Sequence, residues 1–314
     1  LDSAAAVLIW RVWGRRWPDE LRADAHVRAI LERVAAVPAQ TPQAPAPRRP
    51  FLIRLGRPIL MLAHNAVGVI ELYGRLLLDL RFLFRHPSEI PWKEFSANLY
   101  KAGAQALPVS ALVGFLIGVT ISYLSALQLQ AYGADLFIVN ILGISIIREL
   151  GPVLVAVLVA GRSGSAMTAQ IGVMRVTEEI DALATLGISR TLRVVLPKVA
   201  ALTVAMPLLV VWSSASALLG GAIAAMLQLD FSLFYFFSML PKAVPIANLW
   251  IGLAKGAVFG FLIALLACHF GLHVRPNTES LSRRTTISVV TAITVVIIVD
   301  ALFAIFTRNF GMPS

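Results

Sequence analysis

The chain has 314 residues, of which 58% are hydrophobic and 14% are charged, and its mean hydropathy is +0.80. Soluble domains carry roughly 25% charged residues, so this composition excludes a large soluble catalytic domain and indicates a membrane protein. Because one spanning helix needs about 20 apolar residues, the length suffices for five or six crossings and a small appendage.

The net charge of +10 is concentrated at the front of the chain. Residues 1–101 hold 15 Lys and Arg against 9 Asp and Glu, and the other 213 residues hold 12 against 8. A basic front before a sparsely charged body is typical of attachment to an anionic membrane surface, so we expect no nucleic-acid partner. The single cysteine, Cys268, excludes an internal disulfide framework and a multi-cysteine metal site.

The first 101 residues divide into three predicted segments. Residues 1–36 have ordinary soluble character, and the Pro-rich stretch 37–50 predicts an extended linker. Residues 51–101 are apolar but charged, with Glu71, Arg75 and Asp79 at i,i+4 spacing. This pattern predicts helices at the membrane interface rather than across it. A buried helix of a soluble core is the alternative.

Residues 102–314 form the predicted membrane domain. Its five apolar runs are residues 104–128, 136–160, 199–227, 244–270 and 287–306. The loops 162–198 and 271–286 hold eight Lys and Arg, whereas loops 131–135 and 228–243 hold only Lys242. The positive-inside rule therefore places the front of the chain and both basic loops in the cytoplasm, and the C-terminus outside it.

The longer basic loop contains a predicted amphipathic helix over residues 177–186. Thr177 is its expected N-cap and Gly187 its expected end. Its acidic first turn has Glu178, Glu179 and Asp181, and its apolar face has Ile180, Leu183 and Ala184. Since an isolated helix of about ten residues is marginal in water, we expect it to dock, either on its own bundle or, as we favour, on a cytoplasmic partner.

Two further motifs have structural explanations. The small residues of segment 161–172 suit close helix packing, and its serines do not fit the GxSxG esterase pattern. His269 and His273 are four residues apart, but a metal would need more ligands than these. We therefore expect no catalytic residue and no metal site.

Four charged residues lie inside the apolar runs: Arg148, Glu149, Lys255 and Asp300. A charge at the centre of a spanning helix costs roughly 2.5 to 3.5 kcal/mol. Counting residues along the runs places all four at similar depth, in the outer half of the membrane. One interpretation is a structural ion pair of Lys255 with Asp300 or Glu149. The other is a polar cavity, because Arg148 and Glu149 are neighbours that cannot both point at one partner.

The 314 residues contain no GxxxxGK[ST] phosphate loop, so an ATP-driven function would need a second polypeptide.

The segment RELGPVLVAVLVAGRSGSAMTAQIGVMRVTEEIDALATLGI, residues 148–188, is followed by Pro197-Lys198. Together with AKGAVFGF around Lys255 and the late Asp300, it resembles the MlaE/YrbE family of ABC-transporter permeases, which belong to the Mla and Mce lipid-transport systems. The resemblance implies an all-α integral membrane fold with an interfacial N-terminal helix and five transmembrane helices.

The resemblance also implies partners and sites. The permease would be a homodimer in the Gram-negative inner membrane, bound to a cytoplasmic ABC ATPase and a periplasmic MlaD-like Mce-domain protein. ATP and Mg would bind the ATPase, with no cofactor in this chain. The implied ATPase-coupling helix contains Glu178, Glu179, Asp181 and Leu186. The implied phospholipid cavity contains Arg148, Glu149, Lys255 and Asp300.

The front of the chain resembles the second half of a STAS-like α/β domain. Asp2-Ser3 matches a strand-to-helix turn that is phosphorylated in some STAS proteins. We therefore expect a fused STAS-like fragment over residues 1–36, whose first half precedes residue 1.

The predicted function is the permease subunit of an ATP-driven phospholipid transporter. An intramembrane lipid-modifying enzyme and a passive membrane scaffold are the alternatives. The enzyme would need a nucleophile and a base at one depth, but the charged layer contains neither His nor Cys. A scaffold would have no reason to keep four costly charges.

Overall fold

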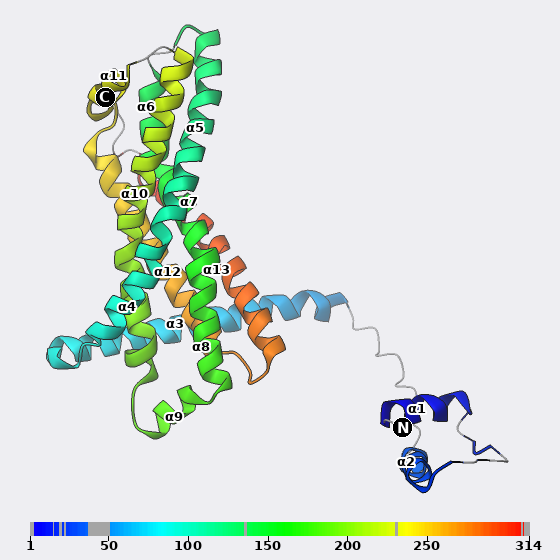
Figure 1. The fold of residues 1–314 in the computed structure, drawn as a ribbon. Coiled ribbons are helices and arrows are strands. Elements are labelled where there is room, and N and C mark those ends of the chain that lie inside the picture. Colours follow the sequence, from blue (N-terminus) through cyan, green and yellow to red (C-terminus); the bar gives the residue numbers. More distant parts are fainter. Residues whose placement is uncertain are drawn as a thin grey trace. The chain divides into compact units, whose positions relative to one another are not determined.

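The computed structural model describes residues 3–14, 16–18, 21, 23–36, 51–134, 137–229, 232–308 and 310 (Figure 1). The chain divides into two compact units, Leu1–Met61 and Leu62–Ser314. The predicted linker 37–50 and Asp2 of the predicted STAS turn lie outside the described residues.

The first unit contains two short helices, α1 (Ser3–Val12) and α2 (Ala25–Ala36). Ala6 and Leu31 are buried in it, and the rings of Trp10 and Trp17 meet edge to face at 5.1 Å. The described part of this unit has helices and no strand, so the STAS resemblance stays a prediction.

The second unit contains five helices long and apolar enough to cross a membrane, which confirms the five predicted runs. They are Trp92–Ala131, Ile138–Val176, Thr191–Leu229, Ile246–Leu272 and Thr278–Phe306. Their elements are α4 (Trp92–Ala102), η2 (Ala104–Ala106), α5 (Leu107–Ala131), α6 (Ile138–Ile144), η4 (Ser145–Leu150), α7 (Gly151–Val159), η5 (Ala160–Gly164), α8 (Ser165–Val176), η6 (Thr191–Val195), α10 (Leu196–Leu229), α12 (Ile246–Leu272) and α13 (Thr278–Phe306).

Three helices connect or flank these spans. They are α3 (Phe51–Arg85), α9 (Glu179–Thr185) and α11 (Leu233–Ala243). Helix α3 is not among the candidate spans, and from Leu62 onward it runs across the bundle rather than along it (Figure 1). Its residues Leu72 and Leu76 are buried against the bundle core, and the predicted contact between Arg75 and Glu71 forms at 2.6 Å. This arrangement suits a helix at the membrane surface.

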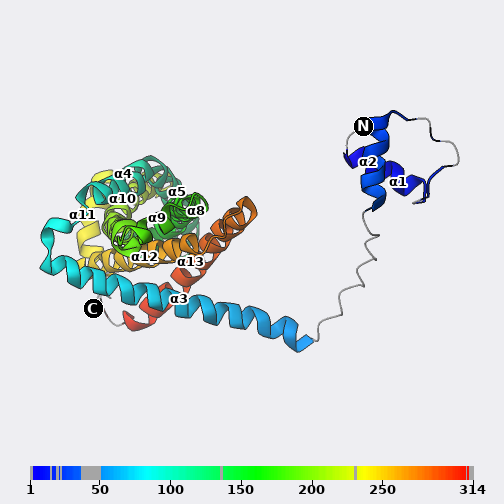
Figure 2. The same cartoon turned by 90° about the horizontal axis from the view of Figure 1, so that it is seen from below.

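Helix α10 lies next to α4, α5 and α12 (Figure 2). The approach to α5 depends on glycine, because a Cβ atom on Gly118 would overlap the carbonyl oxygen of Ala217, and one on Gly220 would overlap that of Phe115. Further along the same two helices the Ser122 hydroxyl donates to the Gly221 carbonyl at 2.8 Å. Small residues thus allow backbone-to-backbone packing, which stabilises spanning helices where water gives no hydrophobic driving force.

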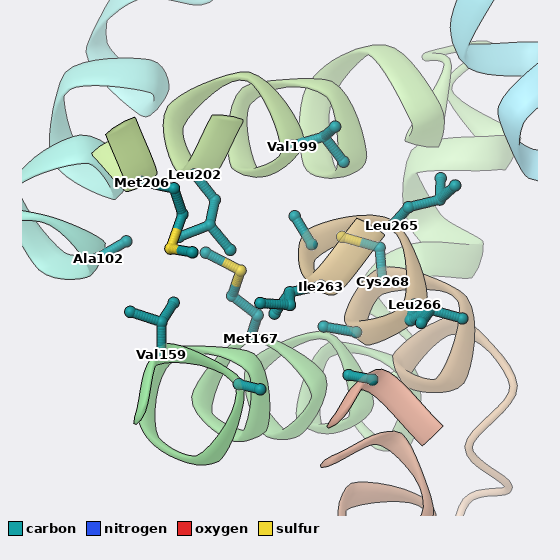
Figure 3. Packing of buried hydrophobic residues seen from close by; sticks show 14 of the residues in the cluster. Ala102, Val159, Met167, Val199, Leu202, Met206, Ile263, Leu265, Leu266 and Cys268 are labelled. Atoms are coloured by element: carbon teal, nitrogen blue, oxygen red, sulfur yellow. The ribbon is translucent and has the colours of Figure 1, made fainter. Parts of the chain in front are cut away.

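The main core lies between α8, α10 and α12 (Figure 3). Met167 and Met206 point into the same space, beside Ile263 (Figure 3). The small-residue segment 161–172 packs here as predicted: Thr168 contacts the Ala267 carbonyl at 3.1 Å and the Ser288 hydroxyl at 2.8 Å. A side chain on Gly172 would overlap Leu281.

The second span is interrupted by two π-helical segments, η4 and η5. The apolar pattern of residues 136–160 did not indicate them. A π-helical turn holds one more residue than an α-helical turn and often marks a functional position. In this chain η4 carries Arg148 and Glu149, and η5 carries Arg162.

Helix α9 differs from its prediction at its start. It begins at Glu179, after Glu178 in a left-handed conformation with φ of +62°. Thr177 as its N-cap was wrong, because α8 continues to Val176 and the Thr177 hydroxyl donates back to the Val173 carbonyl at 3.1 Å. The predicted end is confirmed, since Gly187 has φ of +72°.

The apolar face of α9 packs on its own bundle. Ile180 is buried in the main core and Leu183 packs partly against it, whereas Ala184 is exposed. The helix is therefore held in place by its own chain, with its acidic face outward.

Candidate functional site

The structure brings the four charged residues of the spans into one network, although they come from three different spans. Arg148 and Glu149 lie in η4, Lys255 in α12 and Asp300 in α13. The Lys255 ammonium is 0% exposed, contacts Oε2 of Glu149 and lies 2.8 Å from Oδ1 of Asp300. We call Arg148, Glu149, Lys255 and Asp300 the charged network.

The two cationic side chains are more buried than the two carboxylates. The side chains of Arg148 and Lys255 are 5% and 0% exposed, and those of Glu149 and Asp300 are 35% and 21% exposed. A buried charge is tolerated only with a partner, and here two positive groups face two negative ones. The carboxylates are therefore the accessible side of an electrically neutral cluster.

Arg148 links the network to the end of α13. Its guanidinium donates to the Thr307 carbonyl at 2.6 Å and the Phe310 carbonyl at 2.7 Å. It also donates to Oδ1 of Asn248 at 3.1 Å, and to Oε1 of Glu149 at 3.3 Å. Carbonyl groups at a helix end lack intrahelical donors, and a cation there is favoured by the helix dipole. Arg148 thus caps α13, which ends at Phe306.

The geometry shows the ion pairs of the structural interpretation, and the polar cavity stays a prediction. Lys255 pairs with both Asp300 and Glu149, so the predicted ion pair is present with one ammonium shared between two carboxylates. Arg148 bonds mainly to the carbonyl groups after α13, whereas Glu149 pairs with Lys255. Different partners are expected for two adjacent residues of a helix. The partly exposed carboxylates also give the cluster a polar surface.

Sequence reasoning missed the other partners of Arg148. Asn248 could have been predicted as a partner. It precedes Lys255 by seven residues and so lies on the same face of α12, two turns away. Phe310 gave no such signal, since it is bound through its backbone carbonyl, which every sequence supplies; Thr307 accepts through its carbonyl and also through its hydroxyl, at 3.2 Å.

The predicted coupling residues lie elsewhere, around α9, at the end of the bundle opposite to α6 and α11 (Figure 1). Glu178, Glu179 and Asp181 are exposed, and the Leu186 side chain is 73% exposed. The Asp181 carboxylate pairs with Arg175, and Oε1 of Glu179 accepts from the Thr177 hydroxyl at 2.9 Å. The sequence-predicted residues therefore form two separate sites.

In the described ranges, no three His, Cys, Asp or Glu side chains gather as a metal ion would require. His269 and His273 have ring centroids 4.4 Å apart.

Comparison with known proteins identifies the membrane domain. Residues 95–306 match the family described as Permease MlaE. A protein of Rickettsia bellii named "Probable ABC transporter permease protein" is 36% identical over 201 residues, which cover 64% of this chain and 77% of the relative. The "Intermembrane phospholipid transport system permease protein MlaE" of Haemophilus influenzae is 30% identical over 215 residues, covering 68% of this chain and 82% of the relative. The chain therefore belongs to the MlaE permease family.

Proposed function

We propose that this chain is the permease subunit of an ATP-driven phospholipid transporter in a Gram-negative inner membrane. It moves phospholipid between that membrane and a periplasmic Mce-domain carrier, and so contributes to lipid asymmetry of the outer membrane. Support comes from the family match, from the name of the Haemophilus relative and from five apolar spans. The eight cations of loops 162–198 and 271–286 support a cytoplasmic N-terminus and a periplasmic C-terminus.

The transporter is a homodimer that receives ATP energy from a separate ABC ATPase, which binds ATP and Mg. The surface offered to the ATPase is the exposed face of α9 with Glu178, Glu179, Asp181 and Leu186. Because Ile180 is buried in the core, a movement of α9 also moves the bundle on which it packs.

The charged network forms the polar wall of the lipid cavity. The observation that carries this assignment is the buried Lys255 ammonium, which is shared by two partly exposed carboxylates from two other helical segments. A phospholipid phosphate is an anion that competes with Glu149 or Asp300 for such a cation. Binding at the network would therefore replace one carboxylate and loosen one connection among η4, α12 and α13.

Glu149→Gln, Lys255→Ala and Arg148→Ala variants, compared for thermal stability and co-purified phospholipid, test this assignment. Lys242→Ala is the matched control, because Lys242 is an exposed cation in α11. Loss of bound lipid at near-normal stability supports the lipid wall. A variant in which both members of one pair are neutralised, and which regains its stability but still holds phospholipid, shows that the network is only structural.

A further inference from the structure

A second polar site lies in the membrane unit, apart from the charged network. It is a cavity of about 200 Å³ between α4 and η2 on one side and η5 and α8 on the other. Its polar lining includes Asn98, Lys101, Gln105, Arg162 and Gln170. We call it the basic cavity, because its lining residues include two cations and no acid.

The cations of the basic cavity differ from those of the charged network in lacking carboxylate partners. Arg162 donates to the amide oxygen of Gln105 at 3.2 Å. Within the described part of the chain, none of the ion pairs involves Lys101, Arg162 or Lys198. An uncompensated positive site in a membrane protein attracts an anion.

Lys198, from the start of α10, stands directly behind the cavity wall. It is 5% exposed, and its ammonium donates to Oε1 of Gln170 at 2.7 Å and to Oδ1 of Asn98 at 3.3 Å. An ammonium group only donates, so it holds the oxygen of the Gln170 amide toward itself. The NH₂ group of Gln170 is thereby turned away from Lys198. Lys101, Arg162 and Gln170 together supply the cavity with hydrogen-bond donors.

The ends of two apolar runs place the basic cavity where lipid headgroups are expected. Arg162 follows the apolar run 136–160, and Lys101 precedes the apolar run 104–128, so the two cations mark corresponding ends of two apolar runs within longer helices. Arg162 is 14 residues after Arg148, which separates the cavity from the charged network by about 20 Å along the helix. Met167 and Ala102 add an apolar wall, against which the start of an acyl chain fits.

We propose that the basic cavity binds the phosphate group of a phospholipid in the leaflet nearer to α9. Arg162 and Lys101 provide the positive charge, and the Gln170 amide adds a donor. Phosphate is the shared chemistry of a lipid headgroup and a free anion, and the position at the ends of two apolar runs favours the lipid, since basic pockets between spanning helices bind headgroups. This binding site does not depend on transport through the charged network.

Native mass spectrometry of the full chain in detergent tests the proposal, with phosphatidylglycerol as the probe. Diacylglycerol with the same acyl chains is the phosphate-free comparison, and inorganic phosphate is the lipid-free competitor. We expect phosphatidylglycerol to be retained, diacylglycerol to be lost, and inorganic phosphate at equal concentration to displace nothing. Arg162→Gln and Lys101→Gln each weaken retention by about tenfold, the effect of removing one charge-assisted hydrogen bond.

Three variants make the result specific. Lys93→Gln removes an exposed charge from the same helix as Lys101 and leaves retention unchanged. Gln170→Glu keeps an oxygen for Lys198 but puts a negative charge at the cavity, so the protein folds and loses the lipid. The double variant Lys255→Met, Asp300→Asn removes one ion pair of the charged network and keeps the pair of Arg148 and Glu149, so lipid held at the basic cavity remains whether or not the network forms a lipid wall.

Equal retention by the wild type, Arg162→Gln and Gln170→Glu would overturn the proposal. Equal retention of diacylglycerol would do the same, because the phosphate would then contribute nothing. Displacement by inorganic phosphate would assign the cavity to a soluble anion and overturn the lipid assignment.

Discussion

The Nζ atom of Lys255 in α12 lies 2.8 Å from Oδ1 of Asp300 in α13, and the same ammonium contacts Glu149 in η4. One fully buried cation therefore joins three segments of the membrane domain. Its removal would leave Asp300 without its cation and Glu149 with Arg148 as its remaining partner.

Lys255→Met should lower the free energy of unfolding by roughly 3 to 5 kcal/mol, because breaking a buried pair leaves uncompensated charge. Thermal and denaturant unfolding of the protein in detergent measure this loss. The double variant Lys255→Met, Asp300→Asn restores most of the stability, since the remaining charges of Arg148 and Glu149 pair with each other. A single variant as stable as the wild type would contradict the role of Lys255 as a junction.

Arg148→Ala should release the segment after α13. The Thr307 and Phe310 carbonyls lose their charged donor, and a hydrogen bond to a charged group contributes about 1.5 to 3 kcal/mol. Hydrogen exchange of residues 303–310 should become faster, while exchange in α5 stays unchanged. Arg308→Ala is the matched control, because Arg308 is an exposed arginine in the same segment. Equal exchange in both variants would show that Arg148 does not hold this end.

Much of this architecture could be predicted from hydropathy and scarce charges. The five apolar runs correspond to the five spans. An apolar segment that crosses lipid by itself forms a helix, because a helix satisfies its backbone hydrogen bonds within the segment. The common depth of Arg148, Glu149, Lys255 and Asp300 follows from counting residues at the helical rise, and the structure joins these residues in one network.

Other features depend on three-dimensional contacts that leave little trace in the sequence. The π-helical segment η4 lies inside the apolar run 136–160 and η5 begins at its end, and hydropathy gives no sign of either. Thr177 has the side chain of an N-cap, but the continuation of α8 to Val176 makes it the end of the previous helix. The basic cavity combines residues of the first and the second span, Lys101 and Arg162 among them, and only packing brings these together.

Gly118→Ala should disrupt the packing of α5 on α10, because the added methyl group meets the Ala217 carbonyl oxygen. Overpacking of this kind costs about 1 to 3 kcal/mol, seen as a lower melting temperature and a lower yield of folded protein. Gly74→Ala is the matched control, since nothing lies within 4 Å of a Cβ atom there. A helical Gly-to-Ala change in open space should be neutral or stabilising. Identical melting temperatures of the two variants would contradict the close approach.

Replacing Glu178, Glu179 and Asp181 by Lys should abolish co-purification of the ABC ATPase while membrane insertion stays normal, because all three side chains are exposed. Glu89→Lys, which reverses an exposed charge in η1 (Pro87–Glu89), is the control. Retention of the ATPase at normal yield would mean that α9 serves only to pack on its own bundle through Ile180.

ATP-dependent transfer of a fluorescent phospholipid, measured in liposomes that contain the chain and its ABC ATPase together with a soluble Mce-domain acceptor, tests the proposed transport most directly. We expect transfer with ATP, none when either protein is omitted, and slow transfer for Glu149→Gln at a normal level of bound ATPase. ATP binding by the isolated chain, or lipid transfer at the same rate with and without ATP, would contradict the account.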